Sequence, residues 1–339
     1  MKLRLNKSNR LVLGAILIAI SVAFFSCSDQ KESYELNIPE WFPKPEIPAD
    51  NPLTTKKVKL GKQLFFDARF SSDFSLSCAS CHLPAYAFSD TVAFSSGVHK
   101  RSGERNSPTL VNVAYKPHFF KDGGIESLEL QALAPIDHPG EMDISTTTIV
   151  DRLRKDSLYQ QSFKEVFNSG VTMRGITYAL AAYQRTLIYG NSKYDRVVHE
   201  KSASFSDLEK RGQNLFNSDS LNCSKCHSGV FFTNYSFQNN GLKANYADSG
   251  RAKVTSDPDD AGKFVVLTLR NVEVTGPYMY DGSLKSLSQV IDHYASGGSD
   301  HRNKSTLIDG FSLSDNNKKA LIAYLKTLTD KEFQQNPNQ

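Results

Sequence analysis

The feature that most constrains this chain is a five-residue pattern, Cys-x-x-Cys-His, that occurs twice. The two copies are Cys78-Ala79-Ser80-Cys81-His82 and Cys223-Ser224-Lys225-Cys226-His227. Two thiols on one helical turn can add to the two vinyl groups of a haem, and the next residue then presents its imidazole to the iron. The pattern therefore predicts two covalently attached c-type haems, held by Cys78, Cys81, Cys223 and Cys226, with His82 and His227 as axial ligands.

Two other readings of the cysteines compete with haem attachment. Four cysteines and two histidines could form a zinc site, and a Cys-x-x-Cys pair alone could be a redox dithiol. A zinc site would require the two distant pairs to converge, and it would not need a histidine directly after each pair. A thioredoxin-type dithiol lacks that histidine and lies in a βαβ context, which the sequence does not suggest.

The flanks of the two motifs repeat as well. Before each motif, a glycine and a phenylalanine stand four residues apart, Gly61 with Phe65 and Gly212 with Phe216. This spacing puts both on one helix face, where glycine permits a close helix crossing. Helices with aromatic residues, expected over 176–189 and 318–328, are the natural partners. The repeated order is that of a small cytochrome c domain, so we predict a mainly α fold with two cytochrome-c-like domains.

Four segments follow from this division. They are a signal peptide of the lipoprotein type at 1–26, a tether at 27–55, an N-terminal peroxidatic haem domain at 56–200 and a C-terminal electron-transfer haem domain at 201–335. The boundary lies at the linker 200–204, just before Ser206, which begins an S-x-x-E capping box. Extra helices are expected at 128–134, 148–155 and 158–167, and the best strand candidate is 263–269.

The N-terminus has the features of an export signal. A basic start is followed by an apolar run from Leu11 to Phe25 and then by Cys27. The run is short for a membrane-spanning helix but suits a signal core. Cleavage before Cys27 and lipidation of this residue are predicted, against an uncleaved anchor or plain secretion. Residues 28–55 contain five prolines and are expected to form an extended tether between a membrane-bound lipid and the domains.

The charge distribution argues against nucleic acid as a partner. Residues 1–26 carry four basic residues and no acidic one, so they account for the whole formal net charge of +4. The remainder of the chain is balanced and has no concentrated basic run, which a polyanion-binding surface would need.

Several further segments can be compared with known families. They are Leu60-Gly61 with Leu64-Phe65-Phe66-Asp67, Arg105-Asn106-Ser107-Pro108-Thr109-Leu110, Leu128-Glu129 with Gln131-Ala132 and Pro135-Ile136, Glu141-Met142, Leu269-Arg270-Asn271-Val272, Thr275-Gly276-Pro277-Tyr278-Met279-Tyr280-Asp281-Gly282, and Tyr294-Ala295-Ser296-Gly297-Gly298. Together with the two haem motifs, they resemble the bacterial di-haem cytochrome c peroxidase family, which includes the methylamine-utilisation protein MauG. The resemblance covers roughly residues 56–330.

The resemblance implies two facing cytochrome-c-like domains with a calcium ion at their interface. It makes the haem on His82 the peroxide site and the haem on His227 the electron-transfer site. Asn106, Thr275 and Pro277 fall on the family's calcium-binding positions, where neutral oxygens and water would complete the shell of a hard cation.

Catalytic residues also follow from the resemblance. Gln131 and Glu141 match the distal-pocket glutamine and acid of the family, and Pro135 matches the pocket wall. A glutamate near the iron can take the first proton from peroxide and return it to the departing oxygen. Arg270 is predicted to pair with a haem propionate, because a buried carboxylate needs a charged partner.

Two departures from the family pattern concern the peroxide side. Many members hold the resting haem closed with a histidine sixteen residues after the proximal one. That position is Val98 here, and His99 follows it. Either His99 serves with a one-residue shift, or the iron is always open. In addition, Lys121 stands where the family has a tryptophan between the haems, and lysine cannot act as an aromatic hopping station.

A third departure concerns the sixth ligand of the His227 haem. Conventional peroxidases use a methionine fourteen residues after a motif histidine; that histidine is Tyr280 here, and the methionine position is Tyr294. MauG has the same pattern, with tyrosine as the ligand. A phenolate stabilises ferric iron more than methionine does and lowers the reduction potential. Met279 and His293 are rival ligands.

Three functions remain open at this level. The leading hypothesis is a periplasmic cytochrome-c peroxidase that reduces hydrogen peroxide with electrons from a small cytochrome c or copper protein. The alternative is a MauG-like oxidase that uses peroxide to form a high-valent di-haem state and oxidises a specific partner. The third is a di-haem electron carrier without catalysis, against which Gln131 and Glu141 argue.

Overall fold

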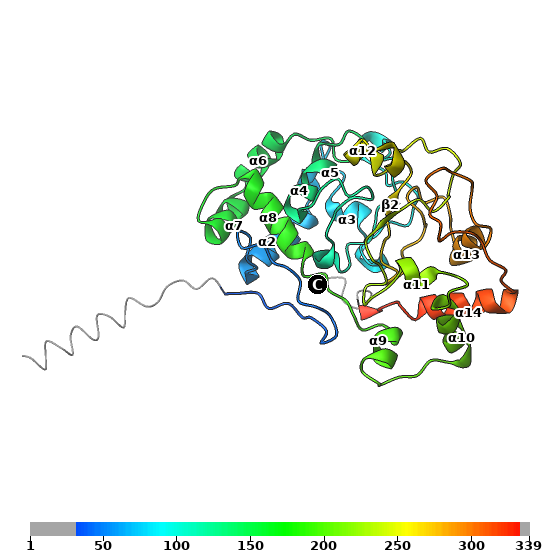
Figure 1. Cartoon of the computed structure of the whole chain (residues 1–339). Helices are drawn as coiled ribbons and strands as arrows, with labels where there is room; N and C mark the ends of the chain where they lie inside the picture. Colours follow the sequence, from blue (N-terminus) through cyan, green and yellow to red (C-terminus); the bar gives the residue numbers. More distant parts are fainter. Residues whose placement is uncertain (1–31, 333–339) are drawn as a thin grey trace, which may run out of the picture.

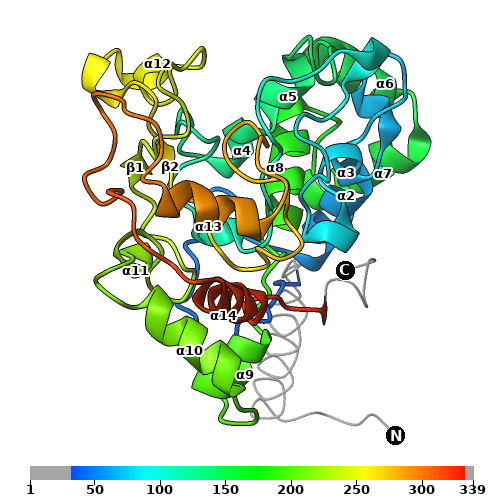
Figure 2. The same ribbon diagram turned by 90° about the vertical axis from the view of Figure 1, so that its right-hand side faces the viewer.

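The computed structural model describes residues 32–332, which form two mainly helical lobes side by side (Figures 1 and 2). The helices of the first lobe are α2 (Thr55–Phe65), α3 (Cys78–Cys81), α4 (Leu128–Gln131), α5 (Leu133–Asp137), α6 (Thr146–Arg154), α7 (Ser157–Phe167) and α8 (Met173–Gln184). The helix α9 (Lys193–Val198) follows, and the second lobe contains α10 (Asp207–Phe216), α11 (Cys223–Cys226), α12 (Ala252–Thr255), α13 (Leu287–Ala295) and α14 (Asp315–Lys326). Two short antiparallel strands, β1 (Phe237–Gln238) and β2 (Phe264–Val265), pair with each other. No helix within residues 32–332 is long and apolar enough to cross a membrane.

Each lobe is organised around one crossed pair of helices, as the repeat predicts. In the first lobe α2 packs on α8, and in the second α10 packs on α14. The two glycines lie at the crossings: a Cβ added to Gly61 would stand 1.8 Å from the carbonyl oxygen of Ala179, and one added to Gly212 would stand 2.0 Å from that of Ala320. Tyr183 and Tyr324, one turn further along the partner helices, are almost completely buried. The expected close crossings are therefore confirmed.

This geometry predicts that Gly212→Ala destabilises the second lobe. Alanine is favoured over glycine in a helix by about 1 kcal/mol, but the added methyl group would collide with the main chain of α14, which cannot move aside like a flexible side chain. Overpacking of this kind costs about 1–3 kcal/mol. Thermal unfolding followed by circular dichroism should show a lower Tm. Gly170→Ala, where a Cβ has no neighbour within 4 Å, is the control, and an equal or higher Tm for Gly212→Ala would contradict this packing.

The other expected elements occur close to their predicted places. The segment expected at 128–134 forms two short helices, α4 and α5, and the segments expected at 148–155 and 158–167 form α6 and α7. The capping box is present: Ser206 Oγ accepts from the Glu209 backbone N–H, and the Glu209 carboxylate accepts from the Ser206 backbone N–H. The strand expected at 263–269 is reduced to β2, and the linker 200–204 follows α9.

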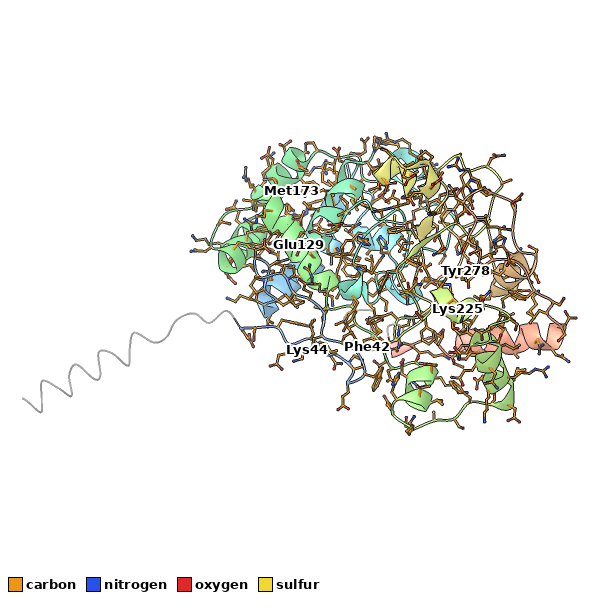
Figure 3. All side chains as sticks on the ribbon, in the orientation of Figure 1. Phe42, Lys44, Glu129, Met173, Lys225 and Tyr278 are labelled. Atoms are coloured by element: carbon orange, nitrogen blue, oxygen red, sulfur yellow. The ribbon has the colours of Figure 1, made fainter. Side chains whose placement is uncertain are left out.

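The predicted extended tether is wrong for the part of it that the structure describes. Residues 32–54 run along both lobes and return to the start of α2 (Figure 1). Phe42 is 6% exposed and lies where the lobes meet (Figure 3), and Asn51 is fully buried. The prolines bend a segment that carries its own apolar side chains, and these find partners in the lobes. Residues 1–31, including Cys27 and the predicted signal peptide, lie outside the described residues.

Candidate functional site

The first Cys-x-x-Cys-His motif forms the single turn of α3, with His82 immediately after it. The Nδ1 atom of His82 lies 3.0 Å from the carbonyl oxygen of Phe88. This hydrogen bond fixes the ring and leaves Nε2 available to a metal, a common arrangement for histidine ligands. Burial also lowers the pKa of His82, so the imidazole is held in the neutral form that coordinates iron.

The second motif is built in the same way, although it lies in the other lobe. It forms the turn of α11, and Nδ1 of His227 lies 3.1 Å from the carbonyl oxygen of Phe232. Burial lowers the pKa of His227 to about 4. Both histidines are therefore oriented by a main-chain carbonyl five or six residues further on, and both fit an iron ligand.

The thiols do not fit the two alternatives to haem attachment. A redox dithiol needs a lowered thiol pKa, but burial raises the pKa of Cys78 to about 12 and that of Cys223 to about 11. Within residues 32–332, no group of three or more His, Cys, Asp or Glu side chains could hold a metal ion, so the two pairs do not converge on a zinc site. The motifs fit two separate haem attachments.

An open cleft lies against the first motif. The space in front of the motif is about 820 Å³ when the part open to solvent is included. Its wall includes the predicted haem-attachment residues Cys78, Cys81 and His82 and the predicted pocket residues Gln131, Pro135 and Glu141. The structure thus brings the predicted peroxide-handling pair, Gln131 and Glu141, into the same cleft as the proximal histidine.

The glutamate of this cleft is held on a turn that follows α5. The turn is closed by hydrogen bonds from the Glu141 N–H to the His138 carbonyl and from the Met142 N–H to the Pro135 carbonyl. Burial raises the pKa of Glu141, and the nearby His138 opposes this shift. A carboxyl group with a raised pKa next to an open cofactor cleft is suited to accept and return a proton.

The glutamine is positioned by a buried network that sequence reasoning missed. Glu129 lies on the same short helix, α4, and its carboxylate accepts from both Arg185 Nη atoms at 2.5 and 3.0 Å (Figure 3 labels Glu129). Asn51, from the segment before α2, donates to the same carboxylate at 2.6 Å. This network fixes α4, and with it Gln131, to α8. The one sequence feature that could have indicated this network is the match of Leu128-Glu129 to the family pattern.

His99 does not reach the cleft, so its candidacy as a closing ligand is not supported. Val98 is fully buried, and its N–H donates to the Glu141 carbonyl at 2.8 Å. His99 has a left-handed backbone (φ 56°), and its side chain is 62% exposed beside Asp73. Val98, at the family's ligand position, points into the protein, and His99, one residue later, points outward.

The candidate sixth ligands of the second haem gather around Asn240. Tyr294 lies on α13. Burial, and then the charges of Cys223 and Cys226, raise the pKa of its phenol, whereas a hydrogen bond with Asn240 lowers this pKa. Asn240 Nδ2 also donates to the sulfur of Met279 at 3.1 Å. His293 instead bonds the Asn240 carbonyl at 2.9 Å. The choice of Tyr294 over Met279 stays a prediction.

Arg270 has a protein carboxylate as its partner, and its predicted contact with a haem propionate stays a prediction. Its two Nη atoms donate to the two carboxylate oxygens of Asp195, each at 2.8 Å, and Nε donates to the Val230 carbonyl at 2.6 Å. The fork of the guanidinium is occupied by this bidentate pair. Lys116 lines a small recess between the lobes, and burial lowers its pKa to about 8. It is a cation that could serve a propionate, and the sequence analysis did not single it out.

The predicted calcium site does not fit a calcium ion. Asn106 Oδ1 lies 3.4 Å from the ammonium nitrogen of Lys121, and the two side chains are 6% and 4% exposed. A divalent cation beside the charged form of this side chain would be repelled. Burial, and then the charge of Arg105, lower the pKa of Lys121 to about 7, and Asp281 opposes this shift. Thr275 and Pro277 are half-buried in the loop before Met279.

Comparisons with known proteins agree with the haem motifs. The sequence profile of the di-haem cytochrome c peroxidase family matches residues 55–203. The methylamine utilization protein MauG of Methylorubrum extorquens is 40% identical over 295 residues, covering 86% of this chain and 82% of that protein. The cytochrome-c peroxidase IdrP1 of Pseudomonas sp. is 32% identical over 361 residues, covering 97% and 94%. The solved structure of a MauG-like protein associated with microbial copper homeostasis is 32% identical, with a TM-score of 0.84 over 89% of this chain and 97% of the other.

Proposed function

Because the chain belongs to the di-haem cytochrome c peroxidase and MauG family, we propose that it reduces hydrogen peroxide to water at the His82 cleft. The observation that carries the proposal is the shared cleft of His82, Gln131 and Glu141. A haem bound to Cys78 and Cys81 would supply the iron that receives peroxide and passes it two electrons. A carrier without catalysis would not need an acid and an amide beside such a cleft.

The residues of the cleft supply proton handling and orientation. Glu141, as a carboxylate, accepts the proton of the peroxide oxygen nearer the iron and delivers it to the outer oxygen, which leaves as water. Two protons and two electrons complete the conversion of one peroxide into two waters. The Gln131 amide donates a hydrogen bond that orients peroxide, and the cleft wall around Pro135 limits the access of bulk water.

Electrons enter through the other lobe in this proposal. The His227 haem would accept them one at a time from a small cytochrome c or copper protein, and the contact between the lobes would carry them onward. Export to the periplasm and lipidation at Cys27 complete the proposal, since covalent haem attachment and such donors belong to that compartment.

A second function, oxidation of a specific partner protein in the manner of MauG, is favoured by one observation. The charge of Tyr294, a candidate sixth ligand, interacts with those of Cys223 and Cys226. A phenolate ligand lowers the reduction potential of a haem, which suits an oxidant that draws electrons from amino acids more than a carrier that passes them to peroxide.

The orientation of His99 gives the first test. Because the side chain of His99 is exposed beside Asp73 and does not line the cleft, we expect the fully oxidised holoprotein to turn over peroxide with reduced cytochrome c as fast as the half-reduced form. Azide should also bind the fully oxidised protein and shift its ferric spectrum. His99→Ala should leave both properties unchanged.

Three outcomes would count against parts of this proposal. A lag that disappears after half-reduction would mean that a closing ligand exists. Loss of this lag in His99→Ala would identify His99 as that ligand. If peroxide changes the ferric spectrum for a long time while several reduced donors remain reduced, the peroxidase fails and the MauG-like function replaces it.

A further inference from the structure

Lys121 is a buried lysine at the contact between the two lobes. It lies on the segment before α4, and its side chain is almost fully enclosed, with 4% of the residue exposed. Its own carbonyl accepts from the N–H of Val265, in β2, at 2.8 Å. The residue is therefore fixed to the second lobe by its main chain as well as by its side chain.

The ammonium group of Lys121 faces three oxygen atoms. The carbonyl oxygens of Met279 and Tyr280 lie at 3.1 and 3.2 Å, and Oδ1 of Asn106 lies at a longer 3.4 Å. All three atoms can only accept hydrogen bonds, and an ammonium group has three hydrogens to donate, whereas a neutral amine has two. The arrangement is thus a set of neutral oxygens around a cation, which is the chemistry of a hard-cation site.

The same oxygens belong to segments that join the lobes. Asn106 is in the first lobe, and its N–H donates to the Tyr280 carbonyl at 3.0 Å, while its Nδ2 donates to the Val92 carbonyl at 3.0 Å. The latter bond directs Oδ1 toward Lys121. Met279 has a left-handed backbone with φ 77°, a conformation that a methionine rarely adopts without support. The ammonium group supplies that support by binding its carbonyl.

We propose that the Lys121 ammonium group is the interface cation of this protein, built into the chain in place of a bound calcium ion. A calcium ion takes six to eight oxygen ligands. Of the predicted calcium ligands, the amide oxygen of Asn106 already faces a side chain that carries its own positive charge, and this side chain also binds the carbonyls of Met279 and Tyr280, which follow Thr275 and Pro277 in the same loop. The nearby carboxylate of Asp281 is itself paired with Lys243 at 2.7 Å, so it adds no free negative charge to attract a metal. The lobes are joined without calcium.

The test uses the full-length holoprotein with both haems and two variants that remove the same charge. Lys121→Ala removes the ammonium and opens space beside the three oxygens, whereas Lys121→Met removes it and fills the space with an apolar chain. Metal content by elemental analysis, calcium titration by calorimetry and Tm with EGTA or added calcium are the readouts.

We expect the wild-type protein to contain no stoichiometric calcium and to keep its Tm in EGTA. Both variants should have a lower Tm, because the three oxygens lose their donor. Calcium should bind Lys121→Ala and raise its Tm by several degrees, and it should leave Lys121→Met unchanged.

Two results would overturn the proposal. One is a wild-type protein that carries about one calcium per chain and loses Tm in EGTA. The other is a folded Lys121→Ala protein that neither binds calcium nor responds to it, which would make Lys121 an ordinary hydrogen-bond donor. If neither variant folds, the wild-type metal content and its response to EGTA decide.

Discussion

Replacing Glu141 with glutamine should lower the peroxide-dependent kcat by about 100-fold or more, the usual contribution of a positioned general acid–base group. Glutamine keeps the size of the side chain and its place in the cleft but cannot take a proton from peroxide. Stopped-flow oxidation of a reduced donor protein measures the change. The ferric spectra of both haems should stay the same, because Glu141 is not an iron ligand in this proposal.

The pH profile separates a proton-transfer role from a structural one. Burial raises the pKa of Glu141 above that of an ordinary glutamate, and the carboxylate form is the one that accepts the proton. Activity of the wild-type protein should therefore fall as the pH drops through this raised pKa. The Glu141→Gln variant should lack this acid limb and keep its low activity across the same range.

Glu104→Gln is the matched control for Glu141. Glu104 is on the same lobe, its side chain is 78% exposed, and its nearest cation, Lys253, is 4.0 Å away. The same chemical change at this site should leave kcat and its pH profile unaltered. Wild-type activity in Glu141→Gln, or an acid limb that persists in it, would show that another group moves the proton.

The repeated motif explains why so much of the fold could be predicted. A glycine such as Gly212 can be recognised because only a residue without a side chain permits the approach to Ala320, and this requirement is local to one helix face. The two Cys-x-x-Cys-His turns are likewise local. Glu141 and Gln131 were found through family resemblance, and the structure places α4 and the turn after α5 along the same cleft as His82.

The contacts that the sequence did not show depend on partners far away in the chain. Arg270 and Asp195 are 75 residues apart, so no local pattern shows that this guanidinium already has a carboxylate. The outward direction of the His99 side chain depends on the left-handed backbone conformation of this residue. Phe42 lies in a proline-containing segment that looks like a tether, and only its contact with Phe231, at 4.8 Å between ring centroids, shows that it packs.

The position of Lys121 illustrates a different limit. The sequence shows that a lysine replaces an aromatic residue, and from this alone one expects a change in electron transfer. It does not show that the longer, flexible side chain reaches the oxygens of Met279 and Tyr280, in a loop 158 and 159 residues away. The replacement of tryptophan by Lys121, which by itself suggests a change in electron transfer, thus also affects the predicted calcium site. Only the folded structure shows this connection.

The buried pair of Arg270 and Asp195 should have the largest effect on stability. The two side chains are 2% and 0% exposed, and Asp195 also accepts from the N–H and Oγ of Ser192 at the start of α9. Asp195→Asn keeps the shape but leaves a buried guanidinium without its counter-charge. Breaking a pair of this kind costs about 3–5 kcal/mol, which thermal or denaturant unfolding of the holoprotein measures directly.

Two comparisons make this prediction specific. Asp259→Asn breaks an ion pair with Arg302 of similar length, 2.7 Å, but its partners are 80% and 62% exposed, so it should cost less than about 1 kcal/mol. The double variant Asp195→Leu with Arg270→Met removes both charges and should be more stable than Asp195→Asn, since no charge is left buried alone. If Asp195→Asn costs no more than Asp259→Asn, the guanidinium has another anion beside it, and the propionate contact first predicted for Arg270 becomes the explanation.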